Sequence, residues 1–408
     1  MNIKDLYAYE ILDSRGNPTV ECVLILNNGA KGIASVPSGA SKGTREALEL
    51  RDNNENRYHG LGVLKAVENI NEKIKPALLG RECIQNQIDD LLIKLDGTDN
   101  KSNLGANAIL AVSLAALKAQ ANAKGKDLFE FVSTGRVSMP IPMMNIINGG
   151  VHAENSLDIQ EFMIVPAVSS FKERLRAGSE VFHTLKRLLK ENNYATSVGD
   201  EGGFAPNLRR NEDAIKFIIE AIKQSGYEPG KDIFIALDCA ATEMYDQEKE
   251  KYIVDKKELS TSELIDYYVN LVNRYPIISI EDPFKEDDFE AFSELTKKLE
   301  NKIMLVGDDY FVTNTKYLKQ GYENHAGNAI LLKANQVGTI TEMIDTIVYA
   351  KKHHYRLIIS HRSGETEDTF ISDLAVGLSI PYIKTGSLSR GERIAKYNRL
   401  LRIENRLK

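Results

Sequence analysis

The chain has 408 residues, of which 42% are hydrophobic and 27% charged, and its formal net charge is −6. This composition is typical of a soluble globular protein, and the length predicts ~2–3 domains, or one barrel with a smaller companion. An acidic chain without a dense Lys/Arg block is not expected to bind nucleic acid, because such binding requires a concentrated basic face. The apolar stretches are interrupted by polar residues, which argues against a membrane span, and the first residues carry no apolar signal core.

Cysteine usage argues against a disulfide framework or a zinc site. Cys22, Cys83 and Cys239 are scattered and show no C-x-x-C spacing. A reducing cytoplasm fits this pattern best. Cys239 follows Asp238, but without a paired histidine it is better explained as a small buried residue than as a nucleophile.

The first part of the chain predicts a small α+β domain over residues 1–135. Three strand-like runs are separated by turn residues, at 3–12, 19–26 and 30–36. The pair Asn28-Gly29 favours a tight hairpin, so these runs predict an antiparallel meander. Helical patterns follow at 63–74, 84–95 and 106–124. Strands first and helices afterwards are typical of an α+β domain.

From residue 139 to 408 strand and helix patterns alternate, which predicts an α/β barrel. Eight candidate strands lie at 143–147, 161–165, 234–237, 277–280, 303–307, 329–332, 356–360 and 382–384. Capping-box spacings mark four helix starts, at Ser170–Glu173, Ser260–Glu263, Thr339–Glu342 and Ser389–Glu392. Residues 244–253 are expected to form an inserted surface hairpin. The predicted fold is therefore an eight-stranded TIM-like (β/α) barrel with a smaller α+β N-terminal domain.

Acidic and basic side chains follow several neighbouring candidate strands. Glu281 ends the strand 277–280, Asp238 and Asp308 end two others, and Lys333 ends a fourth. One acid after a strand is more often the N-cap of a helix. A charged residue at the end of each of four strands makes that reading unlikely, because the carboxyl ends of parallel barrel strands meet at one mouth.

These residue types point to a metal site. Asp238, Glu281 and Asp308 have no Cys or His nearby at ligand spacing, and ligation by oxygen alone selects a hard divalent cation such as Mg²⁺. A cation beside Lys333 lowers the pKa of the amine, which suits a general base. The alternative for Lys333 is a strand-end lysine that reaches solvent.

Three glycine-rich loops add candidate site residues. The loop 198–204 places two acids among glycines, and the loop 36–43 could act as a lid that brings Ser41 to a second metal or a phosphate. Arg362 and Ser363 follow a strand and suit a phosphate, although an arginine there is as often a structural ion pair. Further polar residues complete the expected lining: His152, Gln160 and Glu161.

Specific segments throughout the chain resemble the enolase family. They include DSRGNPTVE, VPSGAS, VGDEGGFAPN, SIEDPF, VGDDYFVTN, LLKANQVGT, SHRSGETEDTF and KTGSLSRGERIAKYN. The resemblance implies an α/β barrel whose first unit breaks the parallel rule. It also implies a hydro-lyase that interconverts 2-phosphoglycerate and phosphoenolpyruvate in glycolysis and gluconeogenesis, with two Mg²⁺ ions per active site.

The resemblance assigns the metal ligands and the base. Asp238, Glu281 and Asp308 resemble the ligands of the first Mg²⁺, and Ser41 resembles the lid ligand of the second. Lys333 is similar to the base that removes the proton from C2 of the substrate.

The remaining site residues are also assigned by resemblance. Glu201 is similar to the acid that helps the C3 hydroxyl leave, assisted by Glu161. Arg362 and Ser363 resemble a phosphate clamp, and Lys384 resembles a contact of the substrate carboxylate. The other implied residues are His152 and His361, around the departing hydroxyl and the phosphate, and Gln160 in the lining.

The resemblance further implies a cytoplasmic homodimer or larger homo-oligomer. Glu21 and Arg402 resemble an ion pair across the dimer interface. A second pool at the cell surface or outside the cell stays open, and the C-terminal Lys408 is weak support for it. Lys42 and Leu61 depart from the residues usual in the family, threonine and lysine, which bears on lid kinetics more than on the reaction.

Two other functions are alternatives to this one. A paralogue acting on a related phosphonate acid would have altered surroundings at Arg362, Ser363 or Lys384, and the sequence shows no such change. A structural or surface-binding protein with an unused site would lose a ligand carboxylate or Lys333, and all of these are present.

Overall fold

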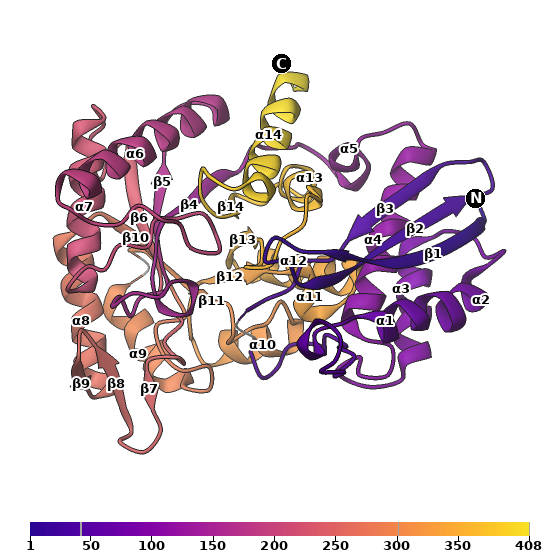
Figure 1. Cartoon of the computed structure of the whole chain (residues 1–408), viewed down its shortest axis with the longest axis horizontal. Coiled ribbons are helices and arrows are strands. Elements are labelled where there is room, and N and C mark those ends of the chain that lie inside the picture. The colour runs from indigo at the N-terminus through magenta and orange to yellow at the C-terminus, as the bar shows by residue number, and fades with distance from the viewer. Residues whose placement is uncertain (41–42, 301, 408) are drawn as a thin grey trace.

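The computed structural model describes residues 1–40, 43–300 and 302–407 and consists of a barrel with a smaller domain at one side (Figure 1). The residues Ser41, Lys42 and Lys408, which figure in the predictions above, lie outside the described residues. The predicted fold, a closed barrel with a smaller N-terminal domain, is confirmed. The predicted boundary between residues 135 and 139 stays a prediction.

The N-terminal domain begins with the predicted meander. Its strands β1 (Ile3–Leu12), β2 (Pro18–Leu26) and β3 (Lys31–Ser35) pair antiparallel in that order. Helix α4 (Ala106–Ala123) packs on β2 and β3. Most residues of α4 are buried because it is apolar on nearly every side.

Other helices surround α4. They are η1 (Tyr58–Gly60), α1 (Leu64–Glu68), the π-helical turn η2 (Asn69–Ile74), α2 (Lys75–Leu78), α3 (Gln85–Asp96) and α5 (Leu128–Val132). The single helix predicted at 63–74 is therefore wrong in detail. A wider turn interrupts it and helical structure continues to Leu78, with Pro76 just past the point where the π-helical turn passes into α2. A proline inside a continuous helix removes one backbone hydrogen bond, which agrees with the irregular turn before it.

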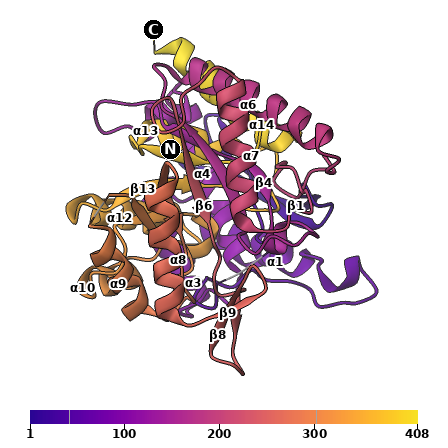
Figure 2. The same ribbon diagram turned by 90° about the vertical axis from the view of Figure 1, so that its left-hand side faces the viewer.

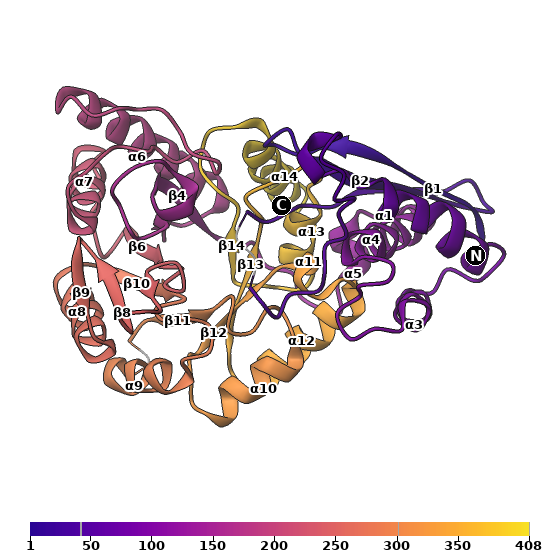
Figure 3. The same cartoon turned by 60° about the horizontal axis from the view of Figure 1, so that its bottom comes forward.

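Eight strands close the barrel, in the order β10-β11-β12-β13-β14-β4-β5-β6 (Figure 3). Their bounds are β4 (Ile141–Asn148), β5 (Glu161–Pro166), β6 (Ile233–Asp238), β10 (Ile277–Glu281), β11 (Met304–Gly307), β12 (Ala329–Leu332), β13 (Arg356–Ser360) and β14 (Tyr382–Lys384). Helices surround this ring: α6 (Phe171–Glu191), α7 (Asn211–Gln224), α8 (Thr261–Arg274), α9 (Phe289–Leu299), α10 (Thr315–Glu323), α12 (Ile340–Lys352), α13 (Phe370–Gly377) and α14 (Gly391–Arg406). Two short turns, η3 (Gly150–His152) and α11 (Ala334–Val337), follow β4 and β12.

Strand β5 runs against both of its neighbours. It is antiparallel to β4 and to β6, whereas the other adjacent pairs of the barrel are parallel. The start of β5 therefore lies level with the ends of the other strands, and Glu161 is directly opposite Asp238. The break in the parallel rule that the family resemblance implied is confirmed.

The strands alternate between an apolar interior and the helical layer, with a period of two residues. One buried cluster fills the interior: Met143, Met163, Val165, Ala236, Met304, Val306, Ala329, Leu331 and Ile358. Two residues beyond Ala236, Val306 and Leu331 stand Asp238, Asp308 and Lys333. The charged residues thus continue the inward-facing rows of the core, which is why they converge at the mouth.

Three of the four predicted helix caps form. Ser170, Ser260 and Thr339 each accept a hydrogen bond from the backbone N–H three residues on. The prediction for Ser389 is wrong. Its hydroxyl donates to the Gly202 carbonyl at 2.7 Å, and α14 starts later, after Arg390.

The predicted surface hairpin is present and carries a third strand. Strands β7 (Tyr245–Asp246), β8 (Lys251–Val254) and β9 (Lys257–Leu259) form an antiparallel sheet that projects from the barrel (Figure 2). Cys22, Cys83 and Cys239 are free and buried, as expected for Cys239. Within the described part of the chain no helix combines the length and apolarity needed to cross a membrane.

The N-terminal domain reaches the mouth of the barrel through residues 36–40. The Ser38 N–H donates to the Gly364 carbonyl at 2.7 Å, and the Gly364 N–H donates back at 2.8 Å. This segment therefore lies against the loop that carries Arg362 and Ser363.

Candidate functional site

The predicted residues gather around one pocket at the mouth of the barrel. Its lining comprises Gly39, His152, Gln160, Glu161, Glu201, Asp238, Asp308, Lys333, Ser360, His361, Arg362, Ser363 and Lys384. Glu281 lies beside this set through its bonds to Lys384, and Ser41 falls outside the described residues. The structure thus brings together residues from distant parts of the sequence.

Lys384 sits among three carboxylates. Its Nζ lies 2.8 Å from Asp238, 3.0 Å from Glu281 and 3.1 Å from Glu161. All four side chains are buried, so the carboxylates raise the pKa of Lys384 well above its usual value despite the opposing effect of burial. One lysine therefore compensates several buried negative charges.

Lys333 pairs with the third predicted metal ligand. Its Nζ lies 2.5 Å from Asp308 Oδ2, and the Gln336 amide donates to Asp308 Oδ1 at 2.8 Å. Burial lowers the pKa of Lys333, but the Asp308 charge outweighs it and the net pKa is raised. The lowering predicted for Lys333 beside a bound cation stays a prediction.

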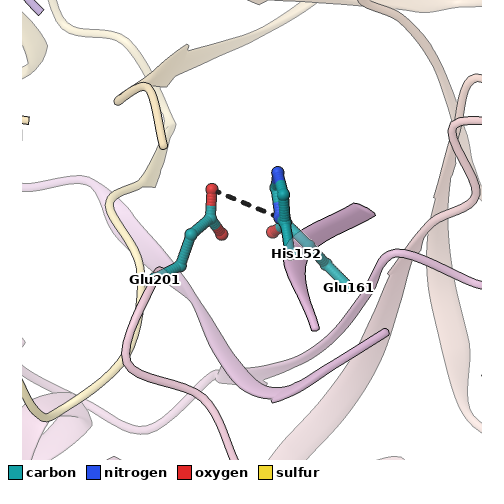
Figure 4. A group of neighbouring side chains, drawn as sticks. All are labelled: His152, Glu161 and Glu201. Carbon is teal, nitrogen blue, oxygen red and sulfur yellow. Dashed lines mark ion pairs between the residues drawn. The ribbon is translucent and has the colours of Figure 1, made fainter. Parts of the chain in front are cut away.

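Glu161 and Glu201 form a second group with His152. Their ligand atoms lie within 4.8 Å of one another, and Figure 4 shows the Glu201 carboxylate turned toward the imidazole. His152 Nδ1 is 3.6 Å from Glu201 and 3.8 Å from Glu161. Burial and the Glu201 charge raise the pKa of Glu161. Burial would also raise the pKa of Glu201, but His361 and His152 hold it well below its usual value. The surroundings therefore favour the protonated form of Glu161 and the ionised form of Glu201.

His361 and Asn145 contact the same glutamate from two sides. His361 Nε2 lies 3.3 Å from Glu201 Oε1, and the Asn145 amide donates to Glu201 Oε2 at 3.0 Å. Burial lowers the pKa of His361 to about 4, so the ring is neutral near pH 7. Glu201 is thus held between the Asn145 amide and the His361 ring.

Arg362 is bound to a carboxylate of the N-terminal domain. Its guanidinium holds Glu46 in a bidentate pair, at 2.9 and 3.1 Å, and donates to Asn335 at 3.2 Å. The hydroxyl of the neighbouring Ser363 accepts the Ala40 N–H at 2.7 Å. The structural ion pair considered for Arg362 therefore exists, and it lies at the pocket wall, where an anion could also reach the arginine.

Protein-family sequence models match nearly the whole chain. Residues 3–132 match "Enolase, N-terminal domain", and residues 136–408 match "Enolase, C-terminal TIM barrel domain". The chain belongs to the enolase family. This membership indicates an enzyme of the lyase type and agrees with the acidic clusters at the mouth.

The donor set of this enolase-family site fits a hard cation. Two groups of potential ligands are compact enough to hold one, His152 with Glu161 and Glu201, and Asp282 with Asp308 and Asp309. Among the described residues Asp238, Glu281 and Asp308 do not form such a group: Asp238 and Glu281 both contact Lys384, whereas Asp308 pairs with Lys333. Burial and Asp308 raise the pKa of Asp309 to about 8, a sign of unbalanced negative charge that a divalent cation would relieve.

Sequence reasoning missed several residues that the enolase-family site uses. Asp282 accepts the N–H groups of Asp308 and Asp309, both at 2.8 Å, and so orients that turn. Asn145 lies two residues after the inward-facing Met143, so the strand period could have found it. Glu46 is an ordinary acid in a loop, and no sequence pattern marks it.

Proposed function

We propose that this chain catalyses the reversible, Mg²⁺-dependent dehydration of 2-phosphoglycerate to phosphoenolpyruvate. The observation that carries the proposal is one pocket lined by an amine, Lys333, and by a carboxylate pair, Glu161 and Glu201. The reaction needs a base for the C2 proton and an acid for the C3 hydroxyl, and these groups can serve as both.

Lys333 is the proposed base. Its Nζ takes the C2 proton, which requires the neutral amine, yet the Asp308 carboxylate at 2.5 Å favours the ammonium. The reacting state therefore requires that Asp308 be compensated by something other than Lys333.

Asp238, Glu281 and Asp308 are the proposed ligands of the first Mg²⁺, and Ser41 of the second. When bound, the ions supply positive charge that offsets these carboxylates and stabilises the negative charge developing on the substrate carboxylate. The buried carboxylates that line the mouth of the barrel support the presence of a cation there.

Glu201 is the proposed acid for the hydroxyl at C3. As the carbon–oxygen bond breaks, the Glu201 proton passes to the departing oxygen, which leaves as water, and a carboxylate remains. His361, Asn145 and His152 orient this group, and Glu161 holds the proton of the pair when Glu201 is ionised.

The substrate anions have matching partners around the pocket. Arg362 and Ser363 are proposed to bind the phosphate, Lys384 the carboxylate, and Gln160 to line the site. Within the described residues Gln160 Oε1 and Glu161 Oε2 are buried without a hydrogen bond, so a polar ligand would satisfy them.

The test follows enol absorbance after purified protein, 2-phosphoglycerate and Mg²⁺ are mixed. Lys333→Ala should lower turnover about 10²–10⁴-fold. The matched control is Lys231→Ala, whose side chain is 71% exposed and which should keep wild-type turnover. A wild type that turns over only a related phosphonate acid, or Lys333→Ala with full activity, would refute the proposal.

A second measurement separates the acid from the base. Because Lys333 removes the C2 proton, Glu201→Gln should still exchange that hydrogen with solvent deuterium while it loses dehydration. Lys333→Ala should lose both. Exchange that disappears in Glu201→Gln and persists in Lys333→Ala would reverse the two assignments.

We further propose a homodimer built on the outer face of the N-terminal sheet, with Glu21 and Arg402 at the interface. The support is a group of exposed apolar side chains on the outer face of β1 and β3: Tyr7, Tyr9 and Ile33. Sedimentation should give a dimer for the wild type and a monomer for Ile33→Asp. A monomeric wild type would exclude this assembly.

A further inference from the structure

Arg393 is a fully buried arginine of α14 that the proposed chemistry does not use. Its guanidinium donates to the backbone carbonyls of Arg362 at 2.7 Å, Ser363 at 2.6 Å and Asp200 at 3.1 Å. It therefore joins the loop after β13 to the loop that carries Glu201.

The same guanidinium also contacts the ring of His361. Arg393 Nη1 lies 2.6 Å from His361 Nδ1. An arginine side chain has only N–H donors and keeps its proton, so Nδ1 must be the acceptor. The ring proton of a neutral His361 is then on Nε2.

Nε2 is the nitrogen that faces Glu201. It lies 3.3 Å from Glu201 Oε1, and both side chains are buried. Among the described residues Nε2 has no well-aligned hydrogen-bond partner, so its proton is available to Glu201 once the carboxylate turns slightly toward it. Arg393 thus holds the ring through Nδ1 and the Glu201 loop through the Asp200 carbonyl.

We propose that Arg393 is a positioning residue that locks His361 in the Nε2–H tautomer, so that His361 acts only as a donor to Glu201. The tautomer stands on its own, and the consequence for catalysis rests on the proposed dehydration. In that reaction Glu201 gives its proton to the departing hydroxyl, and the carboxylate left behind accepts the Nε2–H bond. A fixed donor stabilises the ionised form and so makes Glu201 a stronger acid.

The locked tautomer also restricts where protons come from. A ring whose Nδ1 is occupied by an arginine cannot take a proton there, so His361 cannot relay one to Glu201. Reprotonation of Glu201 must pass through the side of Glu161 and His152.

The tautomer can be measured directly in the wild type, without any assumption about activity. In protein labelled with ¹⁵N-histidine, the protonated and unprotonated nitrogens of a neutral imidazole have well-separated shifts. His361, one of 7 histidines, is assigned by the signal lost in His361→Gln. We expect Nε2 protonated and Nδ1 unprotonated near pH 7; a protonated Nδ1 would overturn the proposal.

Variants then test the link to catalysis. Arg393→Met should give a mixture of tautomers and lower kcat about 10–100-fold with little change in KM. Arg393→Lys keeps a donor and should recover much of the Nε2–H tautomer and much of kcat. The matched control is Ser389→Ala, which loosens the Glu201 loop at Gly202 without touching His361 and should keep the Nε2–H signal.

The outcomes separate the two proposals. A wild type with the expected tautomer and no dehydration would refute the proposed function and leave the lock intact. An Arg393→Lys protein with mixed tautomers and full kcat would refute the catalytic consequence. If Arg393→Met does not fold, the wild-type spectrum and Arg393→Lys still decide the matter.

Discussion

The interior of the barrel and its mouth are built by the same strands but stabilised in opposite ways. Along β11 and β12, Met304, Val306 and Leu331 pack in an apolar cluster, and two residues later Asp308 and Lys333 form a buried ion pair. The interior gains free energy by removing apolar surface from water. The mouth loses free energy by removing charges from water and recovers it only through pairing. Stability and function are therefore divided along the length of each strand.

The largest expected effect comes from Lys384, which compensates Asp238, Glu281 and Glu161 together. Lys384→Met should lower the unfolding free energy of the metal-free protein by about 3–5 kcal/mol, because it leaves buried carboxylates unpaired. Urea unfolding with and without Mg²⁺ measures this. Mg²⁺ should restore part of the loss, and a loss identical in both conditions would contradict the proposed cation site.

A substitution in the barrel interior should destabilise the protein without any dependence on Mg²⁺. Ile358→Ala removes buried methyl groups from the apolar cluster and should cost about 2–5 kcal/mol of unfolding free energy. The loss should be the same with and without Mg²⁺, and turnover per folded molecule should change little. A loss that Mg²⁺ reverses would show that the two regions are not independent.

The raised pKa of Asp309 predicts that the stability of the mouth depends on pH. Its pKa is raised from 3.8 to about 8, so the folded protein keeps a proton that the unfolded chain has already lost. The Asp309 contribution therefore makes the metal-free protein less stable as pH rises from about 4 to about 8. In the presence of a chelator, Asp309→Asn should reduce the change of the urea unfolding midpoint with pH over that window. An unchanged slope would show that Asp309 does not titrate there.

The smallest effect concerns a helix outside both regions. The Ser260 side chain caps α8 by accepting the Glu263 N–H, and the Glu263 carboxylate accepts the Ser260 N–H at 2.7 Å. Ser260→Ala should cost about 1 kcal/mol in thermal or urea unfolding, without any effect on turnover. A substantially larger cost would mean that the hydroxyl has a role beyond capping.

The sequence was sufficient to predict the barrel because each strand has a local signal, a short apolar run. Short apolar runs ending in Asp238, Glu281, Asp308 and Lys333 gave the strands and their mouth, and the family motifs gave the reversed second strand. The helix at 63–74 and the cap at Ser389 were wrong, since a wider turn and a contact with Gly202 decide those points.

Pairing at the site could not be read from the sequence. Which carboxylate lies next to Lys333, and therefore the direction of its pKa shift, depends on distances between strands. Glu46 and Arg393 reach the pocket from a distant loop and from the last helix, and no local pattern indicates either contact.

The reversal of β5 also decides which connection of the barrel faces substrate. Because this strand enters from the mouth, the segment 149–160 before it carries His152 and Gln160, while the connection after Pro166 emerges at the opposite end. Sequence changes that reshape substrate preference are therefore expected ahead of this strand. Insertions directly behind it, between Pro166 and α6, should leave the chemistry untouched, whereas the later loop that carries Glu201 returns to the mouth. An engineer who wished to lengthen this enzyme without disturbing it would begin after residue 166.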